Sequence, residues 1–147
     1  MPWESCITLG TSFSFAYEDT YKTPREVICL LVDIVAKGGN LAINVGPQPD
    51  GRLPKGAVAS LKGMGEWLKV YGEAIYGTRV CEPYKKGNIA FTRKKDEDIL
   101  YALELFPEEG SPVPEEVFLP WEGEVKKVSL LDCGKEVPFT VRGRRHF

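Results

Sequence analysis

Residues 23–51, TPREVICLLVDIVAKGGNLAINVGPQPDG, predict a helix that is followed directly by a buried strand. The helix begins at the capping box TPRE (23–26), where the threonine and glutamate side chains satisfy free backbone N–H groups and proline occupies the first helical position. Apolar residues then recur at helical spacing over 27–35, and KGG (37–39) supplies a cationic last turn and a terminating glycine. The run 41–45 is short and apolar, so we expect a strand buried on both faces.

A second helix is predicted from about residue 54 to residue 71, where apolar residues again recur at helical spacing and Gly72 ends the pattern. A helix, a buried strand, a loop and another helix are typical of a parallel α/β sheet. One buried strand is not a sheet, so other strands must pair with both of its edges. Few residues upstream are suited to this, which indicates a piece of a larger α/β unit.

The pattern changes near residue 80, after which short β-like runs alternate with proline and glycine. We therefore expect α/β structure over 1–80 and all-β structure over 81–147, with the second part forming an incomplete antiparallel β-sandwich packed on the helices. The strands predicted in the second part are 88–93, 98–106, 116–119, 125–131 and 137–141.

The composition is that of an ordinary globular protein, with 147 residues of which 43% are hydrophobic and 27% charged. A formal net charge of −2 gives no clustered positive excess, so we expect neither a nucleic-acid partner nor a membrane partner. The basic run 93–95 is followed by the acidic run 96–98 and is interpreted as a solvated turn.

Neither metal nor redox chemistry is expected from the sequence. The single histidine is His146, and Cys6, Cys29, Cys81 and Cys133 show no CxxC spacing. We therefore predict no metal site and no cofactor, and we expect Cys29, inside the first helix, to be a buried thiol. The first residues lack the basic and apolar regions of a signal peptide, so no compartment is indicated.

Residues 3–21 are rich in aromatic side chains and contain embedded carboxylates, among them Glu4 and Glu18. Sugars stack their C–H faces on aromatic rings, and glycosyl transfer requires two carboxylates beside the scissile bond. A carboxyl group against an aromatic wall, as Glu4 beside Trp3, favours its protonated form and suits a general acid. The alternative is a core loop in which these carboxylates are ion-paired or solvated.

Asn44 is a polar residue late in a strand that is otherwise apolar, so its amide must find a partner. The carboxyl ends of strands are where α/β barrels place their ligand contacts. Asn44 is therefore either a substrate contact or a satisfied structural amide.

Several segments together resemble the α-L-fucosidases of glycoside hydrolase family 29. They occur in one order and spacing and read WESC (3–6), LVDIVAKGGN (31–40), NVGP (44–47) with DG (50–51), and GEWL (65–68) with GEAIYG (72–77). The resemblance runs through nearly all of residues 3–80, and the remainder is similar to the family's C-terminal β-sandwich in type and place.

The resemblance implies a retaining glycosidase with a (β/α)8-like barrel followed by a β-sandwich. It assigns this chain to the last part of the barrel plus an incomplete sandwich, and it places the nucleophilic aspartate of the family upstream of Trp3. The chain alone is therefore expected to be inactive towards terminal α-L-fucosides. Its expected partners are a fucosylated glycan or fucoside and the N-terminal part of the barrel.

Family members differ in where the acid/base carboxylate lies along the chain. The Trp-Glu pair corresponds to Glu4, our first choice, whereas an aromatic segment similar to SFSF (12–15) precedes Glu18, our second choice, and Asp19. Trp3, Phe13 and Asn44 are the expected substrate-binding residues.

Two other functions are compatible with the sequence. One is a non-catalytic carbohydrate-binding module that uses Trp3, Phe13, Phe15 and Tyr17 as a stacking platform. The other is an accessory domain that only completes another chain.

Overall fold

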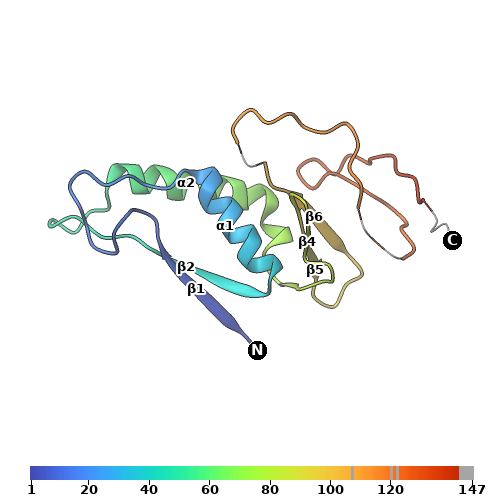
Figure 1. Cartoon of the computed structure of the whole chain (residues 1–147), viewed down its shortest axis with the longest axis horizontal. Helices are drawn as coiled ribbons and strands as arrows, with labels where there is room; N and C mark the ends of the chain where they lie inside the picture. Colours follow the sequence, from blue (N-terminus) through green and yellow to red (C-terminus); the bar gives the residue numbers. More distant parts are fainter. Residues whose placement is uncertain (107, 120, 122, 143–147) are drawn as a thin grey trace.

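The computed structural model describes residues 1–106, 108–119, 121 and 123–142. A parallel strand pair lies beside two helices, and a second, antiparallel sheet lies between these helices and the irregular C-terminal segment (Figure 1). The elements in chain order are β1 (Trp3–Thr8), α1 (Pro24–Ala36), β2 (Gly39–Asn44), α2 (Lys55–Tyr71), the 3₁₀ turn η1 (Gly72–Ala74), β3 (Thr78–Arg79), β4 (Lys85–Lys86), β5 (Ile89–Lys94) and β6 (Leu100–Glu104).

The helix–strand–helix prediction is confirmed over α1, β2 and α2. Both halves of the capping box form, since the Glu26 N–H donates to Thr23 Oγ1 at 3.2 Å and the Thr23 N–H donates to Glu26 Oε2 at 2.7 Å. The helix is followed by Gly38 in the left-handed region, at φ 84°, which turns the chain directly into β2.

Strands β1 and β2 pair in parallel, with Trp3 opposite Gly39 and Thr8 opposite Asn44. Successive side chains of a strand point to opposite faces, so this register gives the pair two distinct faces. The odd-numbered residues of both strands face the helices, where Leu9, Ile43 and Val45 pack with Val27 and Ala57. The other face, which we call the open face, carries Glu4, Cys6, Thr8, Asn40, Ala42 and Asn44.

Two expectations about this sheet are wrong. The run 41–45 is not buried on both faces, because its side chains are all partly exposed, and within the described residues β2 pairs only with β1. Strand β1 itself was not predicted. Its sequence, WESCIT, mixes polar and apolar residues on both faces, so it carries no period-2 signal.

The second sheet is antiparallel and centres on β5. β3 pairs with its last two residues, β4 with its first two, and β6 runs along its other edge. These strands confirm the predictions at 88–93 and 98–106, although the second strand is shorter than expected. The hairpin between β5 and β6 turns at Asp96, whose φ is 63°.

The second sheet packs on α1 as expected. Ala90 of β5 joins Val32 and Ala36 of α1 in one buried cluster, with Ile75 beside them. An ion pair adds to this contact, since Asp33 of α1 lies 3.2 Å from Lys85 of β4.

Polar contacts also tie the second sheet to the turn after α2. The Thr92 hydroxyl, fully buried on β5, donates to the Ala74 carbonyl at 2.7 Å. The Tyr101 hydroxyl donates to Glu73 Oε1 at 2.6 Å, and burial together with this carboxylate raises the pKa of Tyr101.

The strands expected at 116–119, 125–131 and 137–141 are wrong for the described residues. Only a single bridge, between Ser129 and Glu136, forms there, and side chains such as Phe118 remain exposed. A strand requires a partner edge, and apolar spacing alone does not supply one. Within the described residues, the second part is therefore a single sheet followed by an irregular segment.

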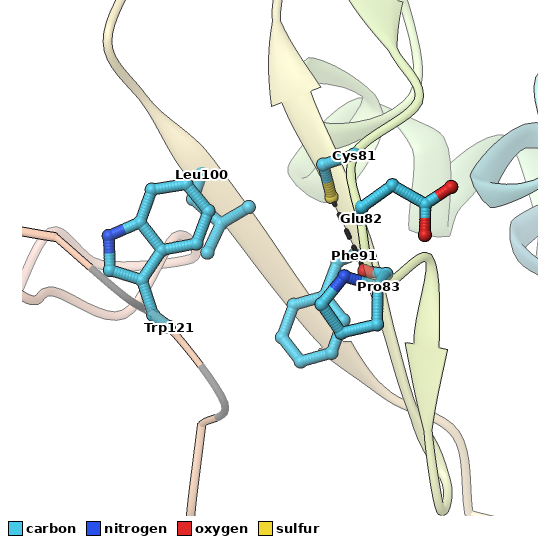
Figure 2. A pocket seen from close by; sticks show the side chains of 6 residues that line it. All are labelled: Cys81, Glu82, Pro83, Phe91, Leu100 and Trp121. Atoms are coloured by element: carbon cyan, nitrogen blue, oxygen red, sulfur yellow. Dashed lines mark hydrogen bonds between the residues drawn. The ribbon is translucent and has the colours of Figure 1, made fainter. Parts of the chain in front are cut away.

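This segment contacts the sheet through Trp121, whose ring lies against Leu100 in a small apolar indentation that also includes Cys81, Pro83 and Phe91 (Figure 2). The indentation has no room for a water molecule. The contact is packing and not a ligand site.

Cys29, expected to be buried, is only partly buried, whereas Cys81 is buried. No described helix combines the length and apolar character that crossing a membrane requires.

Candidate functional site

The carboxyl ends of β1 and β2 meet at one edge of the molecule, because the strands are parallel and Thr8 lies opposite Asn44. Two loops leave the sheet there, 9–23 after β1 and 45–54 after β2, and both extend away from the second sheet (Figure 1). The aromatic stretch singled out in the sequence, residues 3–21, forms β1 and most of the first of these loops. The candidate site is therefore built at the carboxyl edge of the strand pair.

Two open-face side chains hold the first loop against this edge. The Asn44 amide donates to the Phe13 carbonyl at 2.7 Å, and the Thr8 hydroxyl donates to the Ser12 carbonyl at 2.8 Å. Gly46 is needed beside them, since a Cβ there would overlap the backbone at Ser14 and Phe15. The structure thus brings together Asn44 and Phe13, two of the predicted substrate-binding residues, through a backbone contact.

The loop exposes an aromatic surface. The Phe13 side chain is 56% exposed and the Tyr17 side chain is 88% exposed. Phe15 and Tyr17 stack edge to face, with ring centroids 5.1 Å apart. Rings presented in this way suit the apolar C–H face of a sugar.

The carboxylates of this region occupy three different environments. Glu18 is exposed on the loop, next to Tyr17 in the sequence. Glu4 is also exposed and shares the open face with Asn44, but it lies four residues before the end of β1. At about 3.3 Å per residue, this places it roughly 13 Å from the carboxyl edge.

Asp19 differs from both because its Oδ1 accepts three hydrogen bonds, from the Thr11 hydroxyl at 2.6 Å and from the N–H groups of Thr11 and Thr20 at 2.8 Å each. The bonds from Thr11, followed by that from Thr20 and the charge of Lys22, lower the pKa of Asp19. A carboxylate held in its charged form in this way is a poor general acid.

Trp3 does not lie where the sequence predicted. It precedes Glu4 on a strand, so the two side chains point to opposite faces and the indole cannot shield that carboxyl group. The Trp3 ring instead covers Gly39, where any Cβ would overlap it. Trp3 and Glu4 are therefore separated from each other by the sheet and from Phe13 by the length of β1.

Lys22 is a contributor that sequence reasoning missed. Its ammonium donates to the Thr8 carbonyl at 2.8 Å, and its own carbonyl accepts from the buried Ser60 hydroxyl at 2.6 Å. It therefore ties the loop to both β1 and α2. A lone lysine before a capping box gives no sequence signal of this role.

Among the described residues, no group of three or more His, Cys, Asp or Glu side chains is arranged to hold a metal ion.

Comparison with known proteins identifies relatives along most of the chain. A family model described as alpha-L-fucosidase matches residues 1–73. The alpha-L-fucosidase of Branchiostoma floridae is 32% identical to this chain. The matched region covers 90% of this chain and 33% of that relative.

Solved structures agree with the sequence comparison. Alpha-L-fucosidase isoenzyme 1 from Paenibacillus thiaminolyticus superposes with a TM-score of 0.79 at 35% identity, over 92% of this chain and 31% of its own. The Thermotoga maritima alpha-fucosidase in complex with fucose gives a TM-score of 0.60 at 43% identity, over 63% of this chain and 23% of its own. The chain thus spans at most about a third of each of these three relatives.

Proposed function

Because the chain belongs to the α-L-fucosidase family, we propose that it forms the last part of the (β/α)8-like barrel of a retaining α-L-fucosidase, over residues 1–80, followed by part of a β-sandwich over 81–147. The whole enzyme would hydrolyse terminal α-L-fucosides. The fucose complex of the Thermotoga maritima relative supports this substrate class.

The observation that carries the proposal is the hydrogen bond from the Asn44 amide to the Phe13 carbonyl. It fixes the backbone of Phe13, an exposed aromatic residue, at the carboxyl edge of two parallel strands, the edge at which α/β barrels bind their ligands. In a barrel, the face turned away from the helices lines the interior. The open face, with Glu4 and Asn44, would therefore face the interior of the completed barrel.

For the acid/base we propose Glu18 ahead of Glu4, which reverses the order that the resemblance gave. Glu18 lies on the aromatic loop at the carboxyl edge, whereas Glu4 lies far back along β1. The acid/base would protonate the leaving oxygen while an upstream aspartate attacks the sugar, and once deprotonated it would activate the water that releases the fucose.

Kinetics of two variants test this order in the enzyme that carries the chain. Glu18→Ala should slow both steps, by about 10² to 10⁴-fold for a poor leaving group. An aryl fucoside whose leaving group needs no proton should restore the first step, and azide should restore the second by replacing the activated water. Glu66→Ala is the matched control, because that carboxylate is exposed on α2 and pairs with Lys69.

The rescue pattern in Glu4→Ala, with near-normal turnover of Glu18→Ala, would move the role back to Glu4. Absence of the pattern from both variants would place the acid/base outside this chain. The aromatic loop would then shape the pocket without transferring a proton.

We also propose that the isolated chain does not hydrolyse fucosides, since the carboxylate pair of a retaining enzyme must stand about 5 Å apart across the sugar. Within the described residues, the outer edges of β1 and β2 have no partner strand. These edges suit the N-terminal part of the barrel as a partner. Turnover of an aryl α-L-fucoside by the purified chain, above that of a Glu4→Ala and Glu18→Ala double variant, would refute this.

A carbohydrate-binding module is the second candidate function, and the exposed rings of Phe13 and Tyr17 favour it. Trp3 drops out of the proposed platform, because its ring covers Gly39 at the other end of β1. Calorimetric binding of fucose by the isolated chain, lost in Phe13→Ala, would support this function if the whole enzyme shows no hydrolysis.

A further inference from the structure

The loop after β1 is closed at its neck by one carboxylate. Thr11 lies near the start of the loop, and Asp19 and Thr20 lie near its end, where the chain comes back to the sheet. Asp19 Oδ1 accepts from both polar groups of Thr11 and from the Thr20 N–H, so three short hydrogen bonds join the two sides. The residues between them include Phe13, Tyr17 and Glu18, which are exposed.

The other oxygen of the same carboxylate fits against Gly10. A Cβ placed on Gly10 would overlap Asp19 Oδ2, so this carboxylate reaches its position only because residue 10 has no side chain. Gly10 is itself buried, and the Lys22 ammonium lies 3.5 Å from its carbonyl oxygen. The fit is therefore set by shape as well as by hydrogen bonding.

We infer that Asp19 is a positioning residue, which closes the loop over 11–20 and so sets where the aromatic rings and Glu18 stand over the carboxyl edge. This inference rests on the proposed function for its kinetic consequence, although the closure itself does not. It assigns to Asp19 a role other than proton transfer.

The two roles predict opposite results for an isosteric change. Asp19→Asn keeps an oxygen that can accept all three bonds, while removing the group that exchanges a proton. Neutral hydrogen bonds are roughly half as strong as charge-assisted ones, so a positioning role predicts a fall in kcat/KM of less than about tenfold. An acid/base role predicts a fall of about 10² to 10⁴-fold with rescue by azide.

Two further variants should open the loop by different routes. Asp19→Ala removes all three bonds, whereas Gly10→Ala leaves the carboxylate intact and displaces it by a methyl group. Misplacing groups by about 1 Å lowers rates on the order of 10²-fold, and we expect both variants to lose about this much in kcat/KM. Glu136→Gln is the control, since that exposed carboxylate pairs with Lys127 far from the loop.

Chymotrypsin provides a second readout that does not depend on activity. In the enzyme that carries the chain, cleavage after Phe13, Phe15 and Tyr17 should be faster for Asp19→Ala and Gly10→Ala than for wild type. Asp19→Asn and Glu136→Gln should be cleaved at close to the wild-type rate.

The inference is overturned if Asp19→Ala and Gly10→Ala are cleaved no faster than wild type, or if Asp19→Asn loses activity that azide restores. A wild-type enzyme without fucosidase activity would refute the proposed function alone, because the cleavage rates would still decide whether Asp19 closes the loop.

Discussion

Replacing Thr92 by valine tests how the second sheet is attached to the helical part. Thr92 is 0% exposed in the middle of β5, and its hydroxyl donates to the carbonyl oxygen of Ala74, which is 1% exposed. Valine has nearly the same shape but no donor. The substitution therefore leaves a buried carbonyl oxygen without this partner while changing the packing little.

The expected loss of stability follows from two opposing contributions. An unsatisfied buried acceptor costs about 1–3 kcal/mol. The extra methyl group of valine returns about 0.8 kcal/mol by burial of apolar surface. These contributions leave about 0.2–2.2 kcal/mol, so we expect Thr92→Val to lower the free energy of unfolding by about 1 kcal/mol, which corresponds to roughly 3 °C in Tm for a chain of this size.

Urea unfolding followed by circular dichroism at 222 nm measures the change, with micromolar protein and an unchanged m-value. Thr140→Val is the matched control, since Thr140 is exposed and its substitution should stay within about 0.5 kcal/mol. Thr92→Ser keeps the hydroxyl and should be less destabilising than Thr92→Val. The reasoning is refuted if Thr92→Val matches the control, or if serine is the more damaging substitution.

Three further predictions concern the core, the ion pair and the cysteines. Val32→Ala should lower the free energy of unfolding by about 2 kcal/mol, since it removes two fully buried methyl groups, and a smaller loss in urea unfolding than that of Thr140→Val would contradict this. Burial on its own raises the pKa of Asp33, but hydrogen bonds and charges of Lys37 and Lys85 outweigh it, so the net pKa lies below 3.8. The stabilisation by Asp33 is thus fully present above that value and is lost as pH falls through the lower, folded-state pKa. Urea midpoints between pH 2 and 6 should fall more steeply in wild type than in Asp33→Asn, and parallel curves would contradict the ion pair. Cys6, exposed on the open face, should react with a thiol reagent in the isolated chain and become protected in the whole enzyme, whereas Cys81, buried and with its pKa raised by burial, should react slowly in both. Equal reactivity of Cys6 in chain and enzyme would show that the open face is not covered.

The elements that sequence predicted are those whose signals are local. The capping box at Thr23, the glycines after α1 and the period of apolar residues in α2 each act within a few residues, so they fix α1, β2 and α2 in the folded chain. The predictions for β1 and for the segment after β6 were wrong for the same physical reason. A strand is stable only with a partner edge, and which edges are available depends on residues far away in sequence.

The candidate site also has features that the sequence could predict and features that it could not. The need of Asn44 for a hydrogen-bond partner was visible in sequence, but its partner, the Phe13 carbonyl, lies 31 residues away. The environment of Asp19 could not be predicted from sequence, because it arises when the loop closes against Gly10. No residue type in the loop indicates that the Asp19 carboxylate will fit against Gly10. Glu4 and Trp3 are adjacent in sequence, but the alternation of a strand places their side chains on opposite faces.

The register of β1 and β2 has a consequence for how such a pocket diversifies. Because the two strands are aligned even to even, every even-numbered position from 4 to 8 and from 40 to 44 belongs to the open face, and the odd-numbered positions belong to the face on which Ile43 packs with Val27 and Ala57. Point changes at even positions alter the open face without repacking the helices. Thr8 and Asn44 also hold the loop after β1, so a combinatorial library restricted to the other four codons would vary this face at little cost in folding. A single-codon deletion in either strand would exchange the two sets at once.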